Sequence, residues 1–358
     1  MRILAIETSC DETAIAHLLI EGAMEKPDIK VLGNTLLSQA SLHEKYGGVY
    51  PNLAKREHQK NLPILLKQTL KEAGEDEENP NIDYVAVTAG PGLEPALWTG
   101  ITFAEDLGRK WHKPVVPVNH MEGHIFSVLY EAESSLALPA LALLISGGHT
   151  ELVHIKDFRD YEIIGQTRDD AVGEAFDKAA RMLGLPYPGG PEISRMAEID
   201  RARNSEADIV LPRPMIHSKN LDFSYSGLKT AVLYRIRDAK IVDNQFKENM
   251  ARAFEDAAVE VLIEKTRKAL LELEGEVKTL IVAGGVSANI YLNRELEKLI
   301  SEFPEIILKL PTKLLSSDNA IMIGIAAYIK TTKEPGILED QSTIQATGNM
   351  SLNLRRVQ

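Results

Sequence analysis

The chain has 358 residues, of which 44% are hydrophobic, so it holds enough apolar material for two domains with a core each. Its net charge of −12 disfavours a protein that coats nucleic acid by itself, because that function requires a basic excess. The single cysteine, Cys10, excludes an internal disulfide and a cysteine-based zinc cluster. No apolar run approaches the roughly 20 residues of a membrane span, and the first residues lack a signal-peptide layout. We therefore expect a soluble, cytoplasmic protein that does not bind a membrane.

The predicted elements repeat. Two strands enclose a small polar turn near the start of the chain, and a second hairpin of the same kind follows later. The four strands are residues 3–7, 14–20, 141–145 and 151–155. In each half, a later strand runs into a glycine-rich turn and a helix, at residues 84–92 and 279–289. The repetition predicts two similar α/β halves joined near residues 130–139.

Two histidines stand where a short strand meets a helix. Residues 115–118 form the predicted strand, and Asn119 is positioned to cap the helix that follows. Residues four apart share a helix face, so His120 and His124 can present two imidazole nitrogens to one point. Half of a metal site is one interpretation, and hydrogen bonding at the start of a helix is the other. Glu122 does not follow His120 directly, so the pattern is not that of a zincin protease.

Further candidate residues come from the second half. A helix is predicted over 170–183 with Asp177 beside its apolar stripe, and 186–191 holds too many glycines and prolines to be anything except a shaped loop. The longest predicted helix spans 245–274, and residues 316–319 are expected to cap a late apolar helix.

Three candidate sites each allow two interpretations. The turn that contains Ser146, Gly147 and Gly148 suits an anion, because backbone N–H groups converge there, although any tight hairpin needs glycine. Asn289, placed one turn into its helix, either bonds a base or ribose or faces solvent. Asp318 either caps a helix or completes a site of two histidines and one aspartate, which favours iron(II) or zinc with open positions.

Eight segments together carry a family resemblance. They are residues 6–13, 88–93, 120–124, 145–150, 173–178, 187–191, 222–230 and 283–289. In this order, between Met1 and about Ile329, they resemble the universal tRNA threonylcarbamoyladenosine transferase family in its bacterial form, once labelled a glycoprotein endopeptidase. The resemblance implies an α/β fold of two related lobes, like actin, the sugar kinases and the heat-shock chaperone ATPases, with the active site in the interlobe cleft. The lobes would be residues 1–132 plus 315–358, and 133–314.

The resemblance also implies the ligands. His120, His124 and Asp318 would hold one divalent metal ion per subunit, iron(II) by preference and zinc as the alternative. The threonylcarbamoyl-adenylate would be held by Leu144, Ile145, Ser146, Gly147, Gly148, Asp177, Gly190 and Asn289. Ser194 stands where many relatives have aspartate, and Trp98 also departs from the commoner bacterial pattern.

The expected reaction is an acyl transfer. The exocyclic amine of the adenosine adjoining a tRNA anticodon would attack the carbamoyl carbonyl of threonylcarbamoyl-adenylate, and AMP would leave. Asp11 would orient that amine or take its proton. The implied partners are a degenerate paralogous subunit and a small ATPase. The alternatives are a metal-dependent peptidase, which would cleave protein, a non-catalytic ATP-switched binding protein, and a sugar or acetate kinase, which would yield a phosphorylated small molecule.

Overall fold

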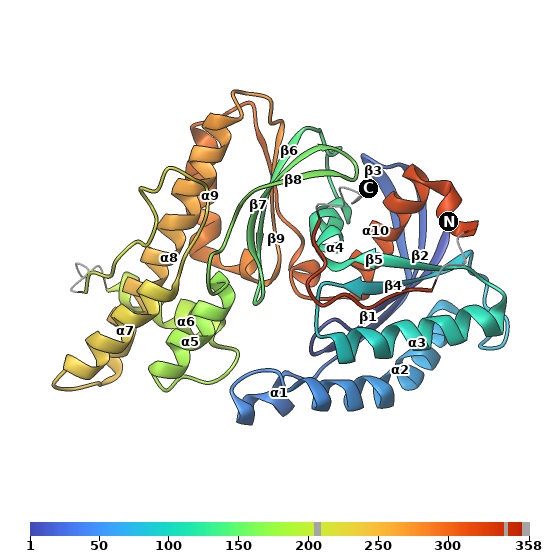
Figure 1. Cartoon of the computed structure of the whole chain (residues 1–358), viewed down its shortest axis with the longest axis horizontal. Helices are drawn as coiled ribbons and strands as arrows, with labels where there is room; N and C mark the ends of the chain where they lie inside the picture. The colour runs from blue at the N-terminus through green and yellow to red at the C-terminus, as the bar shows by residue number, and fades with distance from the viewer. Residues whose placement is uncertain (204–208, 340–342, 353–358) are drawn as a thin grey trace. The chain divides into compact units, whose positions relative to one another are not determined.

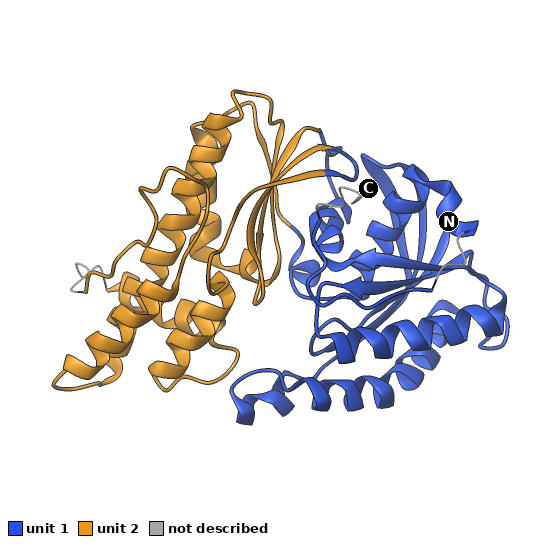
Figure 2. Cartoon of the chain, in the orientation of Figure 1, with its two compact units in different colours: residues 1–137, 157–160, 311–358 blue, residues 138–156, 161–310 orange. Residues whose placement is uncertain are grey.

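The computed structural model describes residues 1–203, 209–339 and 343–352. The chain divides into two compact units, coloured separately in Figure 2. Unit 1 comprises residues 1–137, 157–160 and 311–358, and unit 2 comprises residues 138–156 and 161–310. None of the helices in the described ranges is long and apolar enough to cross a membrane.

Unit 1 is built on a five-stranded mixed sheet with the order β3-β2-β1-β4-β5 (Figure 1). The first three strands pair antiparallel, whereas β4 and β5 continue from β1 in parallel. The strands are β1 Arg2–Glu7, β2 Glu12–Ala23, β3 Lys26–Ser38, β4 Tyr84–Gly90 and β5 Val115–Asn119. Residues 3–7 of β1 are all buried, as expected for a central strand covered on both faces.

Helices cover both faces of this sheet. On one face, α2 (Pro51–Ala73) and α3 (Glu94–Trp111) pack their apolar sides against Leu4 and Ile6 of β1. On the other face lies α10 (Ala320–Lys333), where a Cβ at Gly324 would meet the side chains of Leu18 and Ala5. The short helix α4 (His120–Phe126) follows β5 and contacts α10. Two further short helices, α1 (Ala40–His43) and the 3-10 helix η1 (Glu44–Tyr46), precede α2.

Unit 2 repeats the topology. Its sheet has the order β10-β9-β6-β7-β8, in which β6 pairs antiparallel with β7 and parallel with β9, and β9 pairs parallel with β10. Written in reverse, as β8-β7-β6-β9-β10, this order corresponds strand by strand to β3-β2-β1-β4-β5 of unit 1. The predicted internal duplication is therefore confirmed. The strands are β6 Ala140–Ile145, β7 Thr150–Asp157, β8 Asp160–Gln166, β9 Thr279–Ala283 and β10 Ile307–Lys309. The helices are α5 Val172–Met182, α6 Gly189–Ala202, α7 Ser226–Asp238, α8 Asn244–Glu272 and α9 Ile290–Ser301.

Two local predictions are wrong, and the predicted cap at residues 316–319 is confirmed with Asn319 as the capping residue. The segment 186–191 is not entirely a loop, because α6 begins at Gly189. Pro191 is tolerated there because the first N–H groups of a helix have no partner within it. Asn289 is the N-cap of α9 and does not lie one turn inside the helix. At α10 the cap is Asn319, whose side chain accepts a hydrogen bond from the Met322 N–H, so the carboxylate of Asp318 is not used for capping.

Candidate metal centre and ligand-binding residues

The two histidines of α4 are placed by the end of β5. Asn119 ends the strand, and its side chain accepts a hydrogen bond of 2.8 Å from the Met121 N–H, as the sequence predicted. The helix begins at once, so His120 and His124 lie one turn apart on it. Their rings are 4.7 Å apart between centroids and nearly perpendicular, and both side chains are buried. Two imidazoles therefore face one point in unit 1.

Asp318 reaches the same point from a distant part of the chain. Its Oδ1 lies 3.1 Å from Nε2 of His124 and 3.4 Å from Nε2 of His120. A Cβ at Gly123 would stand only 3.1 Å from side-chain atoms of Met322 and Ile323, so glycine permits the close approach of α4 to α10. The ligand atoms of the three side chains all lie within 4.8 Å of one another. They form a group that could hold a metal ion.

The electrostatics of this group favour a cation. Burial would raise the pKa of Asp318, but His120 and His124 hold it well below its usual value. Burial would lower the pKa of His120, yet the charges of Asp318 and Glu7 raise it well above the usual value. Although His124 Nε2 is close to Asp318, neither of its buried ring nitrogens makes a hydrogen bond within the described part of the chain. A buried polar atom without a partner is rare in proteins, and a metal ion would satisfy one here.

Glu7 contacts the ring nitrogen of His120 that does not face Asp318. This fully buried carboxylate at the end of β1 lies 3.0 Å, through Oε2, from Nδ1 of His120. The hydroxyl of Thr88 donates to the same oxygen at 2.6 Å, and the Ser9 N–H donates to the other. A carboxylate that accepts the Nδ1 proton leaves the Nε2 lone pair directed at a metal. Glu7 was not among the predicted site residues, although a glutamate at the end of a buried strand is a signal that could have identified it.

A polar loop lies beside this group. Asp11 lies in the turn between β1 and β2, and Glu12 is the first residue of β2. Burial, with the charges of Asp318 and Asp11, raises the pKa of Glu12 to about 9. Burial also raises the pKa of the Cys10 thiol, which disfavours the thiolate form. Below the loop, the buried His58 of α2 contacts the Cys10 carbonyl at 3.0 Å and the Thr13 hydroxyl at 2.8 Å. His58 thus fixes the loop that carries Asp11, and its position in the sequence gave no sign of this.

The second set of expected ligand residues lies in unit 2. Leu144 and Ile145 end β6, and their side chains are fully buried, so only their backbone atoms could meet a ligand. Gly147 and Gly148 are exposed at the tip of the turn. The hydroxyl of Ser146 accepts hydrogen bonds from the N–H groups of Gly148 at 3.3 Å and His149 at 3.1 Å. Those two amides therefore already have a partner within the turn.

The side chain of Asp177 lies at the start of α6, close to the backbone that carries Gly190. Oδ1 of Asp177 accepts a hydrogen bond of 2.7 Å from the N–H of Gly189, the residue before Gly190. A Cβ at Gly173 would lie 2.6 Å from the Ser146 carbonyl, so glycine brings the beginning of α5 against the hairpin turn. The structure thus gathers the turn, α5 and the start of α6 in one region of unit 2.

Asn289 is held by a partly buried network of hydrogen bonds around the buried Glu255. Its Oδ1 caps α9 by accepting from the Leu292 N–H, and its Nδ2 donates to Ser194 Oγ at 2.8 Å and to Glu255 Oε1 at 2.6 Å. Ser194 itself donates to Glu255 at 2.7 Å. Gly284, in the turn before Asn289, has a φ of 94° and lies against the carbonyl of Ile145. This turn therefore adjoins the end of β6.

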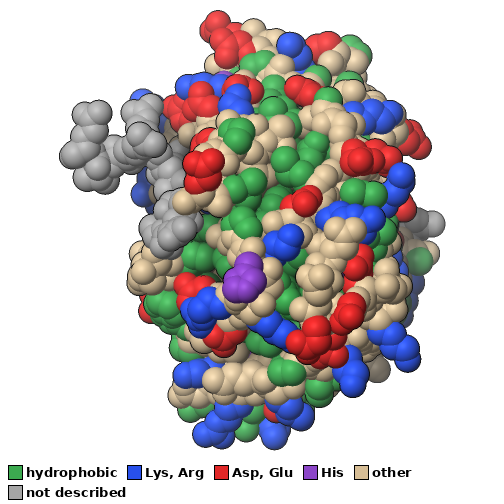
Figure 3. All heavy atoms as spheres, turned by 90° about the vertical axis from the view of Figure 1, so that its right-hand side faces the viewer, with side chains coloured by type: hydrophobic (Ala, Val, Ile, Leu, Met, Phe, Trp, Pro, Cys, Tyr) green, Lys and Arg blue, Asp and Glu red, His purple; other side chains and the backbone are tan. Residues whose placement is uncertain are grey.

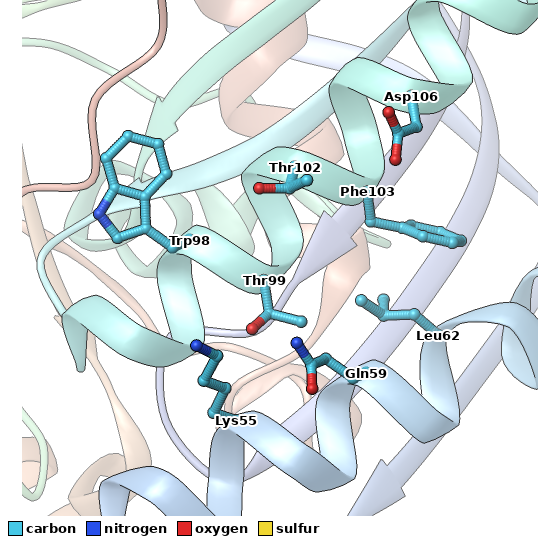
Figure 4. A pocket seen from close by; sticks show the side chains of 8 residues that line it. All are labelled: Lys55, Gln59, Leu62, Trp98, Thr99, Thr102, Phe103 and Asp106. Carbon is cyan, nitrogen blue, oxygen red and sulfur yellow. The ribbon is translucent and has the colours of Figure 1, made fainter.

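A shallow groove of about 290 Å³ lies between α2 and α3 in unit 1 (Figure 4). Lys55 and Trp98 stand at one end of it and Asp106 lines it further along, and Trp98 is 40% exposed.

Comparison with known proteins agrees with the resemblance. A model of the tRNA N6-adenosine threonylcarbamoyltransferase family matches residues 30–325. Proteins of that name are 44% identical in Thermosipho africanus (98% of this chain, 100% of the relative), 43% in Lacticaseibacillus casei (93% of each) and 44% in Persephonella marina (96% and 93%).

Among solved structures, HypF from T. kodakarensis superposes with a TM-score of 0.59 at 12% identity. The match covers 94% of this chain but 49% of HypF, so this chain corresponds to about half of that protein. A second HypF structure, in a phosphate- and nucleotide-bound form, gives a TM-score of 0.57 at 13% identity. At such identities the likeness concerns the fold alone, and it agrees with the predicted class of two related α/β lobes. From the family match and the identity to full-length relatives, the chain belongs to the tRNA N6-adenosine threonylcarbamoyltransferase family.

Proposed function

We propose that this enzyme transfers the threonylcarbamoyl group from threonylcarbamoyl-adenylate to the exocyclic amine of the adenosine adjoining the anticodon in tRNA, and releases AMP. The observation that carries the proposal is the convergence of His120, His124 and Asp318 in a chain whose relatives bear the name of this transferase. Because tRNA is the acceptor, the enzyme would act in the cytoplasm.

His120, His124 and Asp318 would hold one divalent metal ion per subunit. Two imidazoles and one carboxylate leave coordination positions open, which suits iron(II) first and zinc second. The ion would supply Lewis acidity to the oxygens of the bound adenylate. Glu7 would keep His120 in the tautomer that binds the ion, as carboxylates commonly do beside metal-bound histidines.

The residues of unit 2 would hold the threonylcarbamoyl-adenylate. The backbone of Leu144 and Ile145 and the turn Ser146-Gly147-Gly148 would contact it, together with Asp177, Gly190 and Asn289. The amide of Asn289 is fixed by its hydrogen bonds, so the remaining lone pair of its Oδ1 would accept from the ligand at no further cost in conformational entropy. Asp11 would orient the attacking amine or accept its proton, since it lies in the buried loop beside the histidines.

The enzyme would work with a degenerate paralogous subunit and a small ATPase. The groove between α2 and α3 is a suitable surface for one of them, because it combines the exposed Trp98 with the charge of Asp106.

The test is mass spectrometry of tRNA nucleosides after incubation of the chain, with its partners, with threonylcarbamoyl-adenylate and tRNA. A threonylcarbamoylated adenosine next to the anticodon is expected, together with one AMP for each transfer. If AMP is released without modified tRNA, or a peptide is cleaved, the proposed transfer is wrong.

A further inference from the structure

Two tyrosines project from the segment between β3 and α2. Tyr46 is 55% exposed and Tyr50 is 52% exposed, and their rings stack with centroids 5.8 Å apart and an angle of 27° between the planes. The ammonium group of Lys45 lies 5.2 Å from the centroid of Tyr46. Lys55 and Arg56, both exposed, follow on the first turns of α2. We call these five residues the tyrosine ridge; its segment leads from α1 into α2 in Figure 1.

The cations of the tyrosine ridge are not neutralised by neighbours. Within the described residues, Lys45, Lys55 and Arg56 form no ion pair with a carboxylate, whereas most other arginines of the chain do. Residues 44–60 contain four Lys or Arg and two Glu, although the whole chain carries a net charge of −12. The face drawn in Figure 3 shows acidic and basic side chains interspersed. Attraction for an anion must therefore be local, and the ridge provides it.

A chain of hydrogen bonds anchors the backbone of Tyr50 in the tyrosine ridge. The N–H of Tyr50 donates to Nδ1 of the buried His43 at 3.3 Å, and Nε2 of His43 lies 3.2 Å from the Gln39 amide oxygen. The amide nitrogen of Gln39 lies 3.4 Å from Nδ1 of His58, which in turn contacts the Cys10 carbonyl at 3.0 Å. The ridge is therefore connected, through side chains of unit 1 alone, to the loop that carries Asp11. A binding surface supported in this way is preorganised.

Stacked, exposed aromatic rings flanked by unpaired cations are the features that bind single-stranded nucleic acid. Unstacked bases lie on tyrosine rings, and the cations contact the phosphates between them. We propose that the tyrosine ridge binds the anticodon loop of tRNA, with bases stacked on Tyr46 and Tyr50. The inference rests on the proposed function, which requires a loop adenosine to come close to Asp11. A protein partner would also accept exposed tyrosines, but it would not require the three unpaired cations of the same segment, one of which lies over the Tyr46 ring.

The experiment measures the binding of two fluorescent RNAs to the full-length chain. One is a hairpin of an anticodon stem with its seven-nucleotide loop, and the other is the same stem as a blunt duplex. The variants are Tyr46→Ala with Tyr50→Ala, and the matched control is Tyr46→Phe with Tyr50→Phe, which keeps the rings. We expect the alanine variant to bind the hairpin at least about tenfold more weakly, and the phenylalanine variant to bind it within about twofold of wild type. Binding of the blunt duplex should be unchanged in both.

A charge variant provides a second measurement that does not depend on the folding of the alanine variant. Lys45→Gln with Arg56→Gln changes two exposed side chains and should reduce the slope of log K against log salt for the hairpin by about 0.7 for each phosphate that is no longer neutralised. Hairpin binding by the alanine variant at wild-type strength overturns the proposal. So does loss of a partner subunit with RNA binding intact, which would assign the ridge to a protein. Because no transfer is measured, the binding result stands apart from the proposed chemistry.

Discussion

The Oε2 of Glu7 lies 3.0 Å from Nδ1 of His120, on the side of the ring away from Asp318. The residues are 113 positions apart and come together because β1 and β4 pair in parallel and β5 continues the sheet. Burial would raise the pKa of Glu7, but the charge of His120 lowers it, so the carboxylate form persists. The pair therefore fixes which ring nitrogen of His120 faces the carboxylate of Asp318.

Glu7→Gln should weaken metal binding while keeping the three ligands. The amide can donate to Nδ1 and so favour the tautomer whose Nε2 carries a proton, and loss of such a supporting carboxylate commonly costs about 10- to 100-fold in affinity. Zinc(II) titration against a chromogenic chelator measures this. Glu122→Gln is the control, because Glu122 is also buried but faces Arg159 at 3.8 Å. Zinc affinity in Glu7→Gln equal to that of wild type would show that Glu7 does not position His120.

His120→Ala combined with His124→Ala should abolish both metal content and transfer to tRNA. The variant removes two of the three side chains that meet, and a lone Asp318 cannot hold a transition metal tightly. Metal analysis of the purified protein and mass spectrometry of tRNA nucleosides give the two measurements. The exposed His217→Ala serves as the control. Survival of metal and activity in the double variant would refute the assignment of the centre.

Acid should destabilise the folded chain through His58. Burial lowers the pKa of His58, so the unfolded chain takes up a proton at a higher pH than the folded chain does. The free energy of unfolding therefore falls as the pH drops below about 6.5, by at most about 1.4 kcal/mol per pH unit for one proton. Burial also lowers the pKa of His17, so its contribution to the loss of stability in acid adds to that of His58. His58→Gln should flatten the dependence in denaturant titrations at pH 5 to 7, with His217→Gln as control; an unchanged slope would contradict the prediction.

Ser194→Asp should destabilise unit 2. The Ser194 hydroxyl donates a hydrogen bond of 2.7 Å to the fully buried Glu255. An aspartate at position 194 would bring a second negative charge next to the Glu255 carboxylate. Ser194→Ala is the comparison, since it removes the hydroxyl that donates to Glu255 and accepts from Asn289 without adding a charge, and it should cost about 1–3 kcal/mol. Thermal unfolding should show the larger loss for the aspartate, and the excess should shrink at acidic pH as protonation removes the repulsion. Equal melting temperatures for the two variants at neutral pH would count against this account.

Much of the fold followed from local patterns. The two hairpins, the glycine turns and the long helix α8 were predicted because apolar period and turn residues act within a short window. The strand β3, Lys26–Ser38, was not predicted as a whole, since its alternation of exposed and less exposed residues breaks at Val31 and Leu32 and it ends in three exposed residues. Its pairing with β2 determines its length. The start of α6 was misassigned because glycine and proline mark loops in most contexts, yet proline fits the first turn of a helix.

For the candidate centre, the sequence by itself determined that His120 and His124 share a helix face, because four residues make about one turn. It also determined that Asp318 stands before an apolar helix. Only the tertiary structure decided that Asn319 caps that helix, that the carboxylate of Asp318 meets both imidazoles, and that Glu7 lies behind them. The physical reason is range: caps and helix faces are set by neighbours a few residues away, whereas these contacts arise from sheet pairing and helix packing across hundreds of residues.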